Sequence, residues 1–275
     1  MHLKIKNIIK KITPPVLLDF YFSFVNPYGF RGEYKNWKIA ENSSSGYNSE
    51  TILNKTKDSL NKVKNGEAVY ERDSYLFDKI QYAWPLLASL LHVASTNDNR
   101  LNIIDFGGSL GSTYYQNKLF LSQLKDVKWN IVEQPMVARC GQKNFENERL
   151  KFYASPEECL AENDSGAVLF SASLQYVSEP YKVLDYFFQK KIRYFILDRL
   201  VINKTKDLIT VQNVDPLIYK ASYPLWIFKE ENILEYFAKN NYELMVDFDS
   251  LGGDFIIQKT GIRGSYKGYL FKLKN

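Results

Sequence analysis

The chain has 275 residues, enough for one large α/β domain or for an ordinary domain with an extension. Lys and Arg number 36 against 31 Asp and Glu, and the net charge of +5 is too small to indicate nucleic-acid binding by itself. Two cysteines are too few for a disulfide framework or a zinc site, so we expect a soluble protein in a reducing cytoplasm. The longest apolar run, "AWPLLASLL", is far shorter than the roughly 20 residues of a membrane span.

The first segment, "MHLKIKNIIKKITPP", mixes apolar residues with lysines and stops at Pro14 and Pro15. It lacks the continuous apolar core and the cleavage site of a secretory signal. Two interpretations stay open. One is a basic amphipathic helix in peripheral contact with the inner face of the cytoplasmic membrane. The other, more ordinary one is a terminal helix packed on the domain, with its lysines in solvent.

Residues 1–97 are expected to form a helical N-terminal extension or lid. The segment 51–65 has apolar residues at helical spacing, and Gly66 is a suitable stop. The segment 73–95 resembles a second helical region, which Pro85 breaks or restarts.

From residue 98 to residue 275 the pattern changes to strands that alternate with helices. The strand segments are apolar on both faces: 101–106, 128–134, 150–155, 166–173 and 192–198. The helical segments between them are 113–124, 135–147, 156–162 and 179–190. This alternation predicts a Rossmann-like, doubly wound, mostly parallel sheet with helices on both sides.

The last part of the chain predicts a helix over 229–240 and strands over 242–249 and 268–274. Before them, 199–228 reads as irregular and is long for a connection, which predicts a substrate-loop insertion. Its polar and aromatic residues could form a wall suited to a sugar: Gln212, Asp215, Tyr219, Tyr223 and Trp226. The alternative is a loop folded over its own small core, with these apolar residues inside: Leu217, Ile218, Leu225 and Ile227.

The stretch "IIDFGGSLGST" follows the first of these strands, at the sheet edge where such folds bind ligands. A phosphate-binding P-loop needs a lysine that this stretch lacks. A dinucleotide motif needs glycine at three positions, which here hold Gly107, Ser109 and Ser112. What remains is an acid, Asp105, followed by a cluster of glycines.

"DFGGSLGST" resembles the first motif of class I S-adenosylmethionine-dependent methyltransferases, D/E-x-G-x-G-x-G, with a serine at the middle glycine. The resemblance implies that S-adenosyl-L-methionine is the cofactor and that its methionine part lies against this backbone. The residues implied to hold it are Asp105, Gly107, Gly108, Ser109 and Gly111. The alternative is a glycine-rich turn between a strand and a helix.

Two further strand ends extend the resemblance. Glu133, with Gln134 beside it, ends the second strand and is placed to accept the ribose hydroxyls of an adenosine, as in that family. The alternative is a glutamate in solvent. Ser155 follows the third strand, where the family often presents a polar group to the adenine.

"FSASLQYVSEP" follows the fourth strand and resembles the stretch that the family places beside the transferable methyl. This implies that Ser173 and Gln175 lie at the cofactor and that Gln175 and Tyr176 line the methyl group; Ser171 belongs to the same stretch. The alternative is a strand end that caps the next helix.

A narrower resemblance covers most of the chain. The segments that carry it are "GYNSE", "YERDS", "DFGGSLGSTYYQNK", "VEQ", "LQYVSEP", "LDR", "TVQ" and "YPLWIF". They are similar to a family of predicted methyltransferases found among bacterial genes for surface polysaccharide assembly, such as capsule and lipopolysaccharide. The resemblance implies a saccharide or saccharide precursor as acceptor.

Removal of a proton from an acceptor hydroxyl needs a base. His2 and His92 both lie in the lead-in, and His92 reads as structural. No metal-binding constellation is visible. Because histidine is scarce, acids and tyrosines remain as candidates. The acids are Asp198 at the end of the fifth strand and Glu71 and Asp73 in "YERDS", and Tyr176 is the catalytic tyrosine.

The sequence therefore predicts a methyltransferase that O-methylates a sugar or a sugar-linked group of a surface polysaccharide. Two alternatives stay open: an NAD-dependent sugar oxidoreductase or epimerase, and a non-catalytic partner in a polysaccharide assembly complex.

Overall fold

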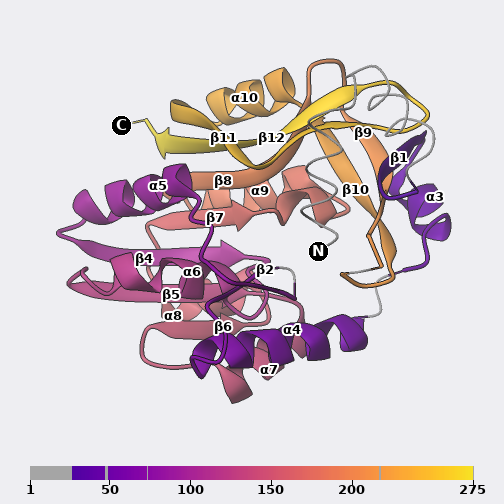
Figure 1. The fold of residues 1–275 in the computed structure, drawn as a ribbon. Coiled ribbons are helices and arrows are strands. Elements are labelled where there is room, and N and C mark those ends of the chain that lie inside the picture. The colour runs from indigo at the N-terminus through magenta and orange to yellow at the C-terminus, as the bar shows by residue number, and fades with distance from the viewer. Residues whose placement is uncertain (1–26, 47–48, 73, 217, 275) are drawn as a thin grey trace.

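The computed structural model describes residues 27–46, 49–72, 74–216 and 218–274. Its central strands are β4 (Arg100–Phe106), β5 (Asp126–Val132), β6 (Leu150–Tyr153), β7 (Ala167–Ser171) and β8 (Tyr194–Asn203). They lie in the order β6-β5-β4-β7-β8, and all are parallel (Figure 1). The chain first builds outward from β4 through β5 to β6, and then returns to β7 on the other side. The strand order thus reverses between β4 and β7, where sheets of this kind bind ligands.

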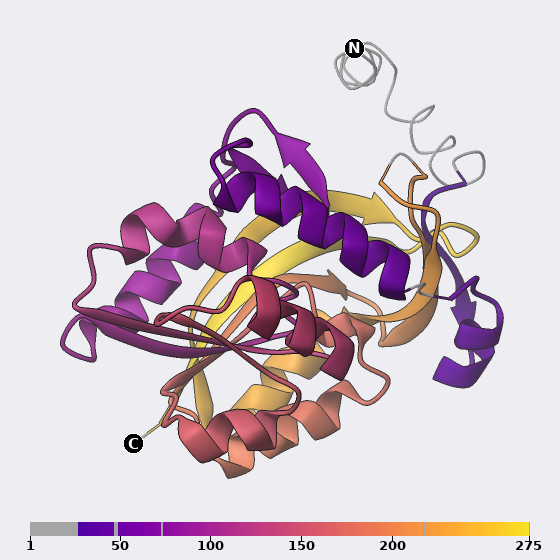
Figure 2. The same ribbon diagram turned by 90° about the horizontal axis from the view of Figure 1, so that it is seen from below.

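Helices cover both faces of this sheet (Figure 2). One apolar core packs α5 (Trp84–Ser95), α6 (Ser112–Leu121) and α7 (Pro135–Asn144) against it. The other packs α8 (Pro156–Glu162), α9 (Pro180–Gln189) and α10 (Glu230–Lys239) against the opposite face. Ile103 and Ile104, neighbours on β4, are fully buried in different cores, as expected for a strand covered on both faces. The predicted Rossmann-like, doubly wound fold class is confirmed.

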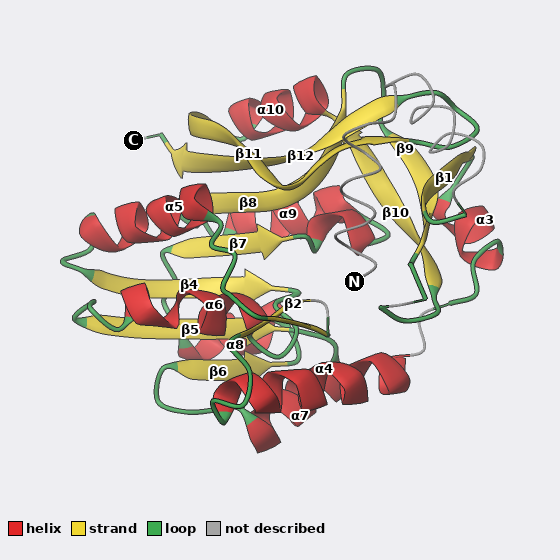
Figure 3. Ribbon diagram, viewed as in Figure 1, coloured by secondary structure: helices red, strands yellow, loops and turns green. Residues whose placement is uncertain are grey.

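Beyond β8 the sheet becomes antiparallel. β12 (Arg263–Leu273) runs antiparallel to β8 and to β11 (Tyr242–Ile256). β10 (Ser222–Lys229) pairs with β8 only through its last two residues, in parallel. The rest of β10 pairs antiparallel with β9 (Leu208–Asn213), which pairs antiparallel with β1 (Gly29–Tyr34). Figure 3 shows this extension as strands that curve away from the parallel core.

The prediction that 199–228 is irregular was wrong. Most of it is strand: the end of β8, then β9 and β10. The β-branched run 209–211 is buried in β9. Pro224 lies within β10, although proline cannot donate a ladder hydrogen bond and so argues against a strand in the sequence. Among the described residues, the segments 204–207, 214–216 and 218–221 are irregular, as expected.

The described part of the N-terminal extension is mixed. It contains α3 (Trp37–Asn42) and α4 (Ser49–Lys64), which confirms the helix expected over 51–65. The helix expected from residue 73 begins only at Trp84, with Pro85 in its first turn. Before it, β2 (Tyr70–Arg72) and β3 (Tyr75–Phe77) form an antiparallel hairpin, in which Tyr70 pairs with Phe77.

The basic segment 1–15 lies outside the described residues. Within the described ranges, none of the helices combines the length and the apolar character that crossing a bilayer requires.

Candidate functional site

The loop after β4 is tightly packed against two polar side chains. A Cβ on Gly108 would lie 2.5 Å from Cγ of Asp105, and one on Gly107 would lie 2.5 Å from Cβ of Ser173. The side chains of Asp105 and Ser173 therefore leave no room for a Cβ at Gly108 and Gly107. Ser109, at the position of the usual middle glycine, has φ of 54°. This left-handed conformation is open to glycine, and it costs a serine about 1–2 kcal/mol.

Asp105 lies at the end of β4, fully buried. Its Oδ2 accepts a 2.9 Å hydrogen bond from Nε1 of Trp129, whereas Oδ1 has no hydrogen-bond partner among the described residues. Burial raises the pKa of Asp105 to about 7, and the nearby charge of Glu133 adds to the rise, while the Trp129 bond and the charge of Arg199 act against it. The group is thus poised between its neutral and charged forms near neutral pH.

Glu133 joins the end of β5 to the glycine loop. Its Oε1 accepts a 3.2 Å hydrogen bond from the main-chain nitrogen of Ser109, and its Oε2 accepts one of 2.8 Å from that of Gln134. Burial raises the pKa of Glu133, and these two bonds act against the rise. Gln134 itself is exposed before the first turn of α7. The structure thus brings together the loop and the acid that the sequence assigned to the cofactor.

The turn after β7 adds two more polar atoms without partners. Oγ of Ser173 and Oε1 of Gln175 are buried and, in the described part of the chain, accept or donate no hydrogen bond. Nε2 of Gln175 donates to the main-chain oxygen of Arg199, 3.2 Å away. Between β7 and this turn, Ala172 has φ of 56°. Buried polar groups rarely lack partners, and strained residues gather at functional sites, so this edge has the marks of a binding site.

Asp198, one of the predicted bases, is 2% exposed. Its Oδ2 accepts a 2.8 Å bond from the hydroxyl of Ser171, and its Oδ1 accepts one of 2.8 Å from the hydroxyl of Ser250 on β11. These contacts tie β7, β8 and β11 together. The arrangement favours a positioning role for Asp198 over a role as general base.

Glu71, another predicted base, reaches the site from the β2–β3 hairpin. It is 1% exposed; Oε1 accepts from the main-chain nitrogen of Ser74, and Oε2 accepts a 2.7 Å bond from the hydroxyl of Ser112, the first residue of α6. The hairpin therefore holds a carboxylate at the N-terminus of the helix that follows the glycine loop. Asp73 lies outside the described residues.

Part of the predicted aromatic wall forms. The hydroxyl of Tyr176 donates to Oε1 of Gln212 at 2.7 Å, and the ring of Tyr176 meets that of Tyr223 edge-on at 5.4 Å. Tyr219 and Tyr223 lie with their hydroxyls 3.3 Å apart. Trp226 instead stacks on Phe228.

The alternative, a loop folded over its own small core, is not what these residues form. Leu225 and Ile227 are fully buried, but they lie on β10 and pack with Leu208 in the core of the sheet. Leu217 lies outside the described residues. Asp215 and Ile218 lie, partly buried, in the turn between β9 and β10.

Ser155 has a structural function. Its hydroxyl accepts a 3.2 Å bond from the main-chain nitrogen of Glu158 and so caps α8, which accounts for the residue without a ligand. Among the residues that the structure describes, no three His, Cys, Asp or Glu side chains lie close enough to hold a metal ion.

Sequence analysis did not identify three residues that contact the predicted site residues: Trp129, Ser112 and Ser250. Trp129 could have been found, because it lies on the predicted strand next to that of Asp105 and a buried carboxylate needs a donor. Ser250 gave no signal, because β11 reaches the neighbourhood of β8 only through β12.

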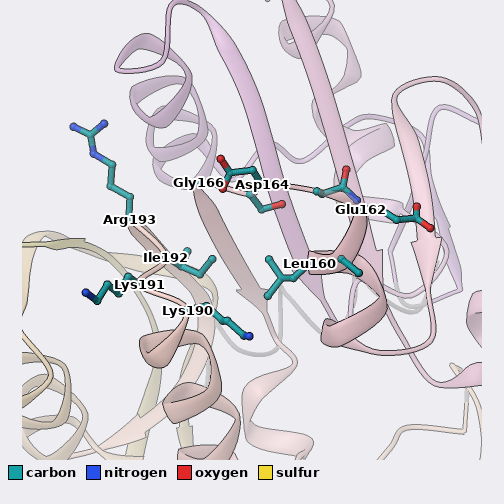
Figure 4. A pocket seen from close by; sticks show the side chains of 11 residues that line it. Leu160, Glu162, Asp164, Gly166, Lys190, Lys191, Ile192 and Arg193 are labelled. Carbon is teal, nitrogen blue, oxygen red and sulfur yellow. The ribbon is translucent and has the colours of Figure 1, made fainter.

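One hollow of the structure lies elsewhere. It has a volume of about 590 Å³ and is lined by residues 160–166 and 190–193, which precede β7 and β8 (Figure 4). It is therefore at the amino ends of these strands, opposite the glycine loop.

No protein-family model and no curated protein sequence matches the chain. Among solved structures, it is similar to a complex of LepI with SAM, with 10% identity, 70% of this chain and 47% of that chain covered, and a TM-score of 0.43. It thus spans about half of that protein. It is also similar to a S-adenosylmethionine-dependent methyltransferase from Clostridium acetobutylicum, with 14% identity, 81% and 99% coverage and a TM-score of 0.44.

A third similar structure is the N-terminal domain of EvdMO1 in the presence of SAH and D-fucose, with 11% identity, 83% and 98% coverage and a TM-score of 0.48. At these scores the assignment of fold rests on the chain's own strand order and strand directions, which are those of a doubly wound α/β sheet with an antiparallel edge.

Proposed function

We propose that the protein is a S-adenosylmethionine-dependent methyltransferase whose cofactor site lies at the carboxyl ends of β4, β5 and β7. The observation that carries this proposal is a set of three buried oxygens at this edge that have no hydrogen-bond partner among the described residues: Asp105 Oδ1, Ser173 Oγ and Gln175 Oε1. The amide oxygen of Gln175 is an acceptor and never a donor, and the same is true of Asp105 Oδ1 when Asp105 is ionised. They suit a ligand that carries N–H donors and positive charge, and S-adenosylmethionine carries an ammonium group and a sulfonium.

The same edge argues against a dinucleotide. In a dinucleotide site the pyrophosphate lies at the N-terminus of the helix after the glycine loop. In this chain the carboxylate of Glu71 contacts Ser112 at that helix terminus. This carboxylate would repel a pyrophosphate.

The residues present fit the proposed cofactor in three places. The carboxylate of Glu133 is placed to accept ribose hydroxyls, with the exposed Gln134 beside it. The backbone of 107–111 would lie against the cofactor, and Ser173 Oγ and Gln175 Oε1 would bind its amino-acid end. When bound, S-adenosylmethionine supplies a methyl group on a positively charged sulfur, which an acceptor atom attacks in a single displacement. The protein's task is then to position the acceptor and, for a hydroxyl, to take up its proton.

We propose that the acceptor is a hydroxyl of a saccharide or saccharide precursor. The segments similar to polysaccharide-associated methyltransferases support this choice, and so does the hydrogen-bonded wall of Tyr176, Gln212 and Tyr223. Glu71 and Asp198 are both nearly fully buried and engaged by serine hydroxyls. Either can act as the base only after the acceptor hydroxyl has replaced one of those serines.

The test is to incubate the protein with methyl-labelled cofactor and extracted polysaccharide precursors, and to identify what carries the label. We expect label in a saccharide fraction, and we expect a large loss of transfer in Y176F. The matched control is Tyr75→Phe on the exposed part of the β2–β3 hairpin. Cofactor binding without label in any saccharide fraction would instead support the non-catalytic partner.

A further inference from the structure

The backbone of β8 is distorted next to the proposed site. Leu197 pairs with Tyr269 of β12 and Leu200 pairs with Lys267, so Asp198 and Arg199 together oppose a single residue. This is a β-bulge, and Arg199 within it has φ of 52°. A left-handed conformation costs an arginine about 1–2 kcal/mol. Bulges next to functional sites re-aim a side chain that a regular strand would send to the other face.

The re-aimed guanidinium lies next to the carboxyl end of β7, at the middle of β8. Its Nη2 donates a 3.2 Å hydrogen bond to the hydroxyl of Ser171, and the side chain is 19% exposed. The main chain of the same residue is fixed on both sides: its nitrogen donates to Oγ of Ser250 at 3.1 Å, and its oxygen accepts from Nε2 of Gln175. The main chain of Arg199 is thus bonded to Gln175, whose Oε1 lacks a hydrogen-bond partner among the described residues, and the guanidinium is bonded to Ser171.

An ion pair with Asp198 does not account for this strain. Both oxygens of Asp198 already accept 2.8 Å bonds from serine hydroxyls, whereas Nε of Arg199 lies 3.5 Å from Oδ2. The carboxylate is therefore satisfied without the arginine, and the backbone strain has another cause. A partly buried guanidinium with fixed geometry is the side chain best suited to bind a carboxylate or a phosphate.

We propose that Arg199 forms an anion subsite that binds a carboxylate or phosphate group of a ligand next to the carboxyl end of β7. The proposal rests on the proposed function, because it adds a charged contact to the same site. Two sources offer this chemistry: the carboxylate of the cofactor's amino-acid part, and an acidic group on the saccharide acceptor. Ser171 is then a positioning residue for the guanidinium, and Ser250 is one for the main chain of Arg199.

The experiment compares wild type with R199Q, R199K and R199G by calorimetric titration. R199G keeps a residue that adopts the left-handed backbone without strain, so it separates loss of the guanidinium from misfolding of the bulge. The matched control is Arg193→Gln, an exposed arginine at the amino end of β8. The probes are S-adenosylhomocysteine, methylthioadenosine, which lacks the carboxylate, and inorganic phosphate added to protein saturated with S-adenosylhomocysteine.

If the anion is the cofactor's carboxylate, R199Q and R199G bind S-adenosylhomocysteine roughly ten- to hundredfold more weakly and bind methylthioadenosine like wild type. If the anion belongs to the acceptor, their affinity for S-adenosylhomocysteine is unchanged, and phosphate binding seen in wild type is lost. In either case R199K retains part of the binding and R193Q behaves like wild type.

Two results contradict different claims. Wild type that binds S-adenosylhomocysteine, with R199Q and R199G unchanged toward all three probes, overturns the anion subsite alone. If wild type does not bind S-adenosylhomocysteine, the proposed function is contradicted. Phosphate is then titrated into the ligand-free wild type and R199G. Phosphate binding by wild type that R199G lacks supports the anion subsite, whereas equal binding by the two proteins, or no binding by wild type, overturns it.

Discussion

The main-chain nitrogen of Ser109 donates a hydrogen bond to Oε1 of Glu133, with 3.2 Å between the two atoms. The two residues are 24 positions apart in the chain and follow neighbouring parallel strands. The bond joins the glycine loop to the acid proposed to receive the ribose. A change at either residue is therefore expected to alter the same binding event.

Replacement of Glu133 tests this connection. Glu133→Ala removes both the proposed ribose acceptor and the restraint on Ser109, so the affinity for S-adenosylhomocysteine should fall roughly 100-fold, as for two lost hydrogen bonds to a charged group. Glu133→Gln keeps one acceptor oxygen and should lose less. Titration calorimetry measures both, with the exposed Glu148→Ala as control. Equal affinity in E133A and E148A would contradict the assignment.

Asp105→Asn should change how stability depends on pH. The pKa of Asp105 is raised from 3.8 to about 7, so the folded state holds its proton where the unfolded state has released it. The stabilisation that this carboxyl gives is complete below pH 3.8, falls as pH rises, and is lost above pH 7. The free energy of unfolding of wild type relative to D105N should therefore drop by roughly 4 kcal/mol across this range.

Urea unfolding of both proteins at several pH values between 5 and 8 checks this prediction. Wild type should lose stability relative to D105N up to about pH 7, and the difference should then level off. Parallel stability curves for the two proteins would show that Asp105 titrates normally.

Gly108→Ala should destabilise the fold. The added Cβ would lie 2.5 Å from Cγ of Asp105, a short and fully buried side chain that cannot move aside. We expect a loss of about 1–3 kcal/mol in the free energy of unfolding, as for other overpacked sites. Gly166→Ala is the control, since a Cβ there meets no atom within 4 Å. Similar losses in the two variants would mean that the close approach to Asp105 is not what requires glycine.

The contact between Glu71 and Ser112 should couple the β2–β3 hairpin to α6. A double-mutant cycle with E71Q and S112A should give a coupling of about 0.5–3 kcal/mol in the free energy of unfolding, because the two side chains share one buried hydrogen bond. Additive effects would show that the hairpin is held by its other contacts, such as that of Tyr70 with Gln116.

The parallel core could be predicted because its strands are short apolar runs buried on both faces and separated by clear helix starts. Pro135, Pro156 and Pro180 each begin a helix, close to where the pattern placed one. The glycine loop and Glu133 followed from their places at two strand ends.

The antiparallel extension could not be predicted in the same way. β9 and β10 owe their strand conformation to pairing with each other and, through β9, with β1, which is far away in the chain. The left-handed conformations of Ser109 and Arg199 are also set by their surroundings, because neither residue type favours them. The contacts that explain the site, such as Ser250 with Asp198, depend on that long-range pairing.

The central claim is that the edge formed by the glycine loop, Glu133 and the turn at Gln175 binds S-adenosylmethionine. Thermal unfolding with S-adenosylhomocysteine or with NAD tests it most directly, because a ligand that binds only the folded state raises the midpoint. At about 100 times its dissociation constant the ligand should stabilise the protein by roughly 2.7 kcal/mol, which is a shift of several degrees. We predict this shift with S-adenosylhomocysteine and none with NAD; a shift with NAD alone would contradict the account.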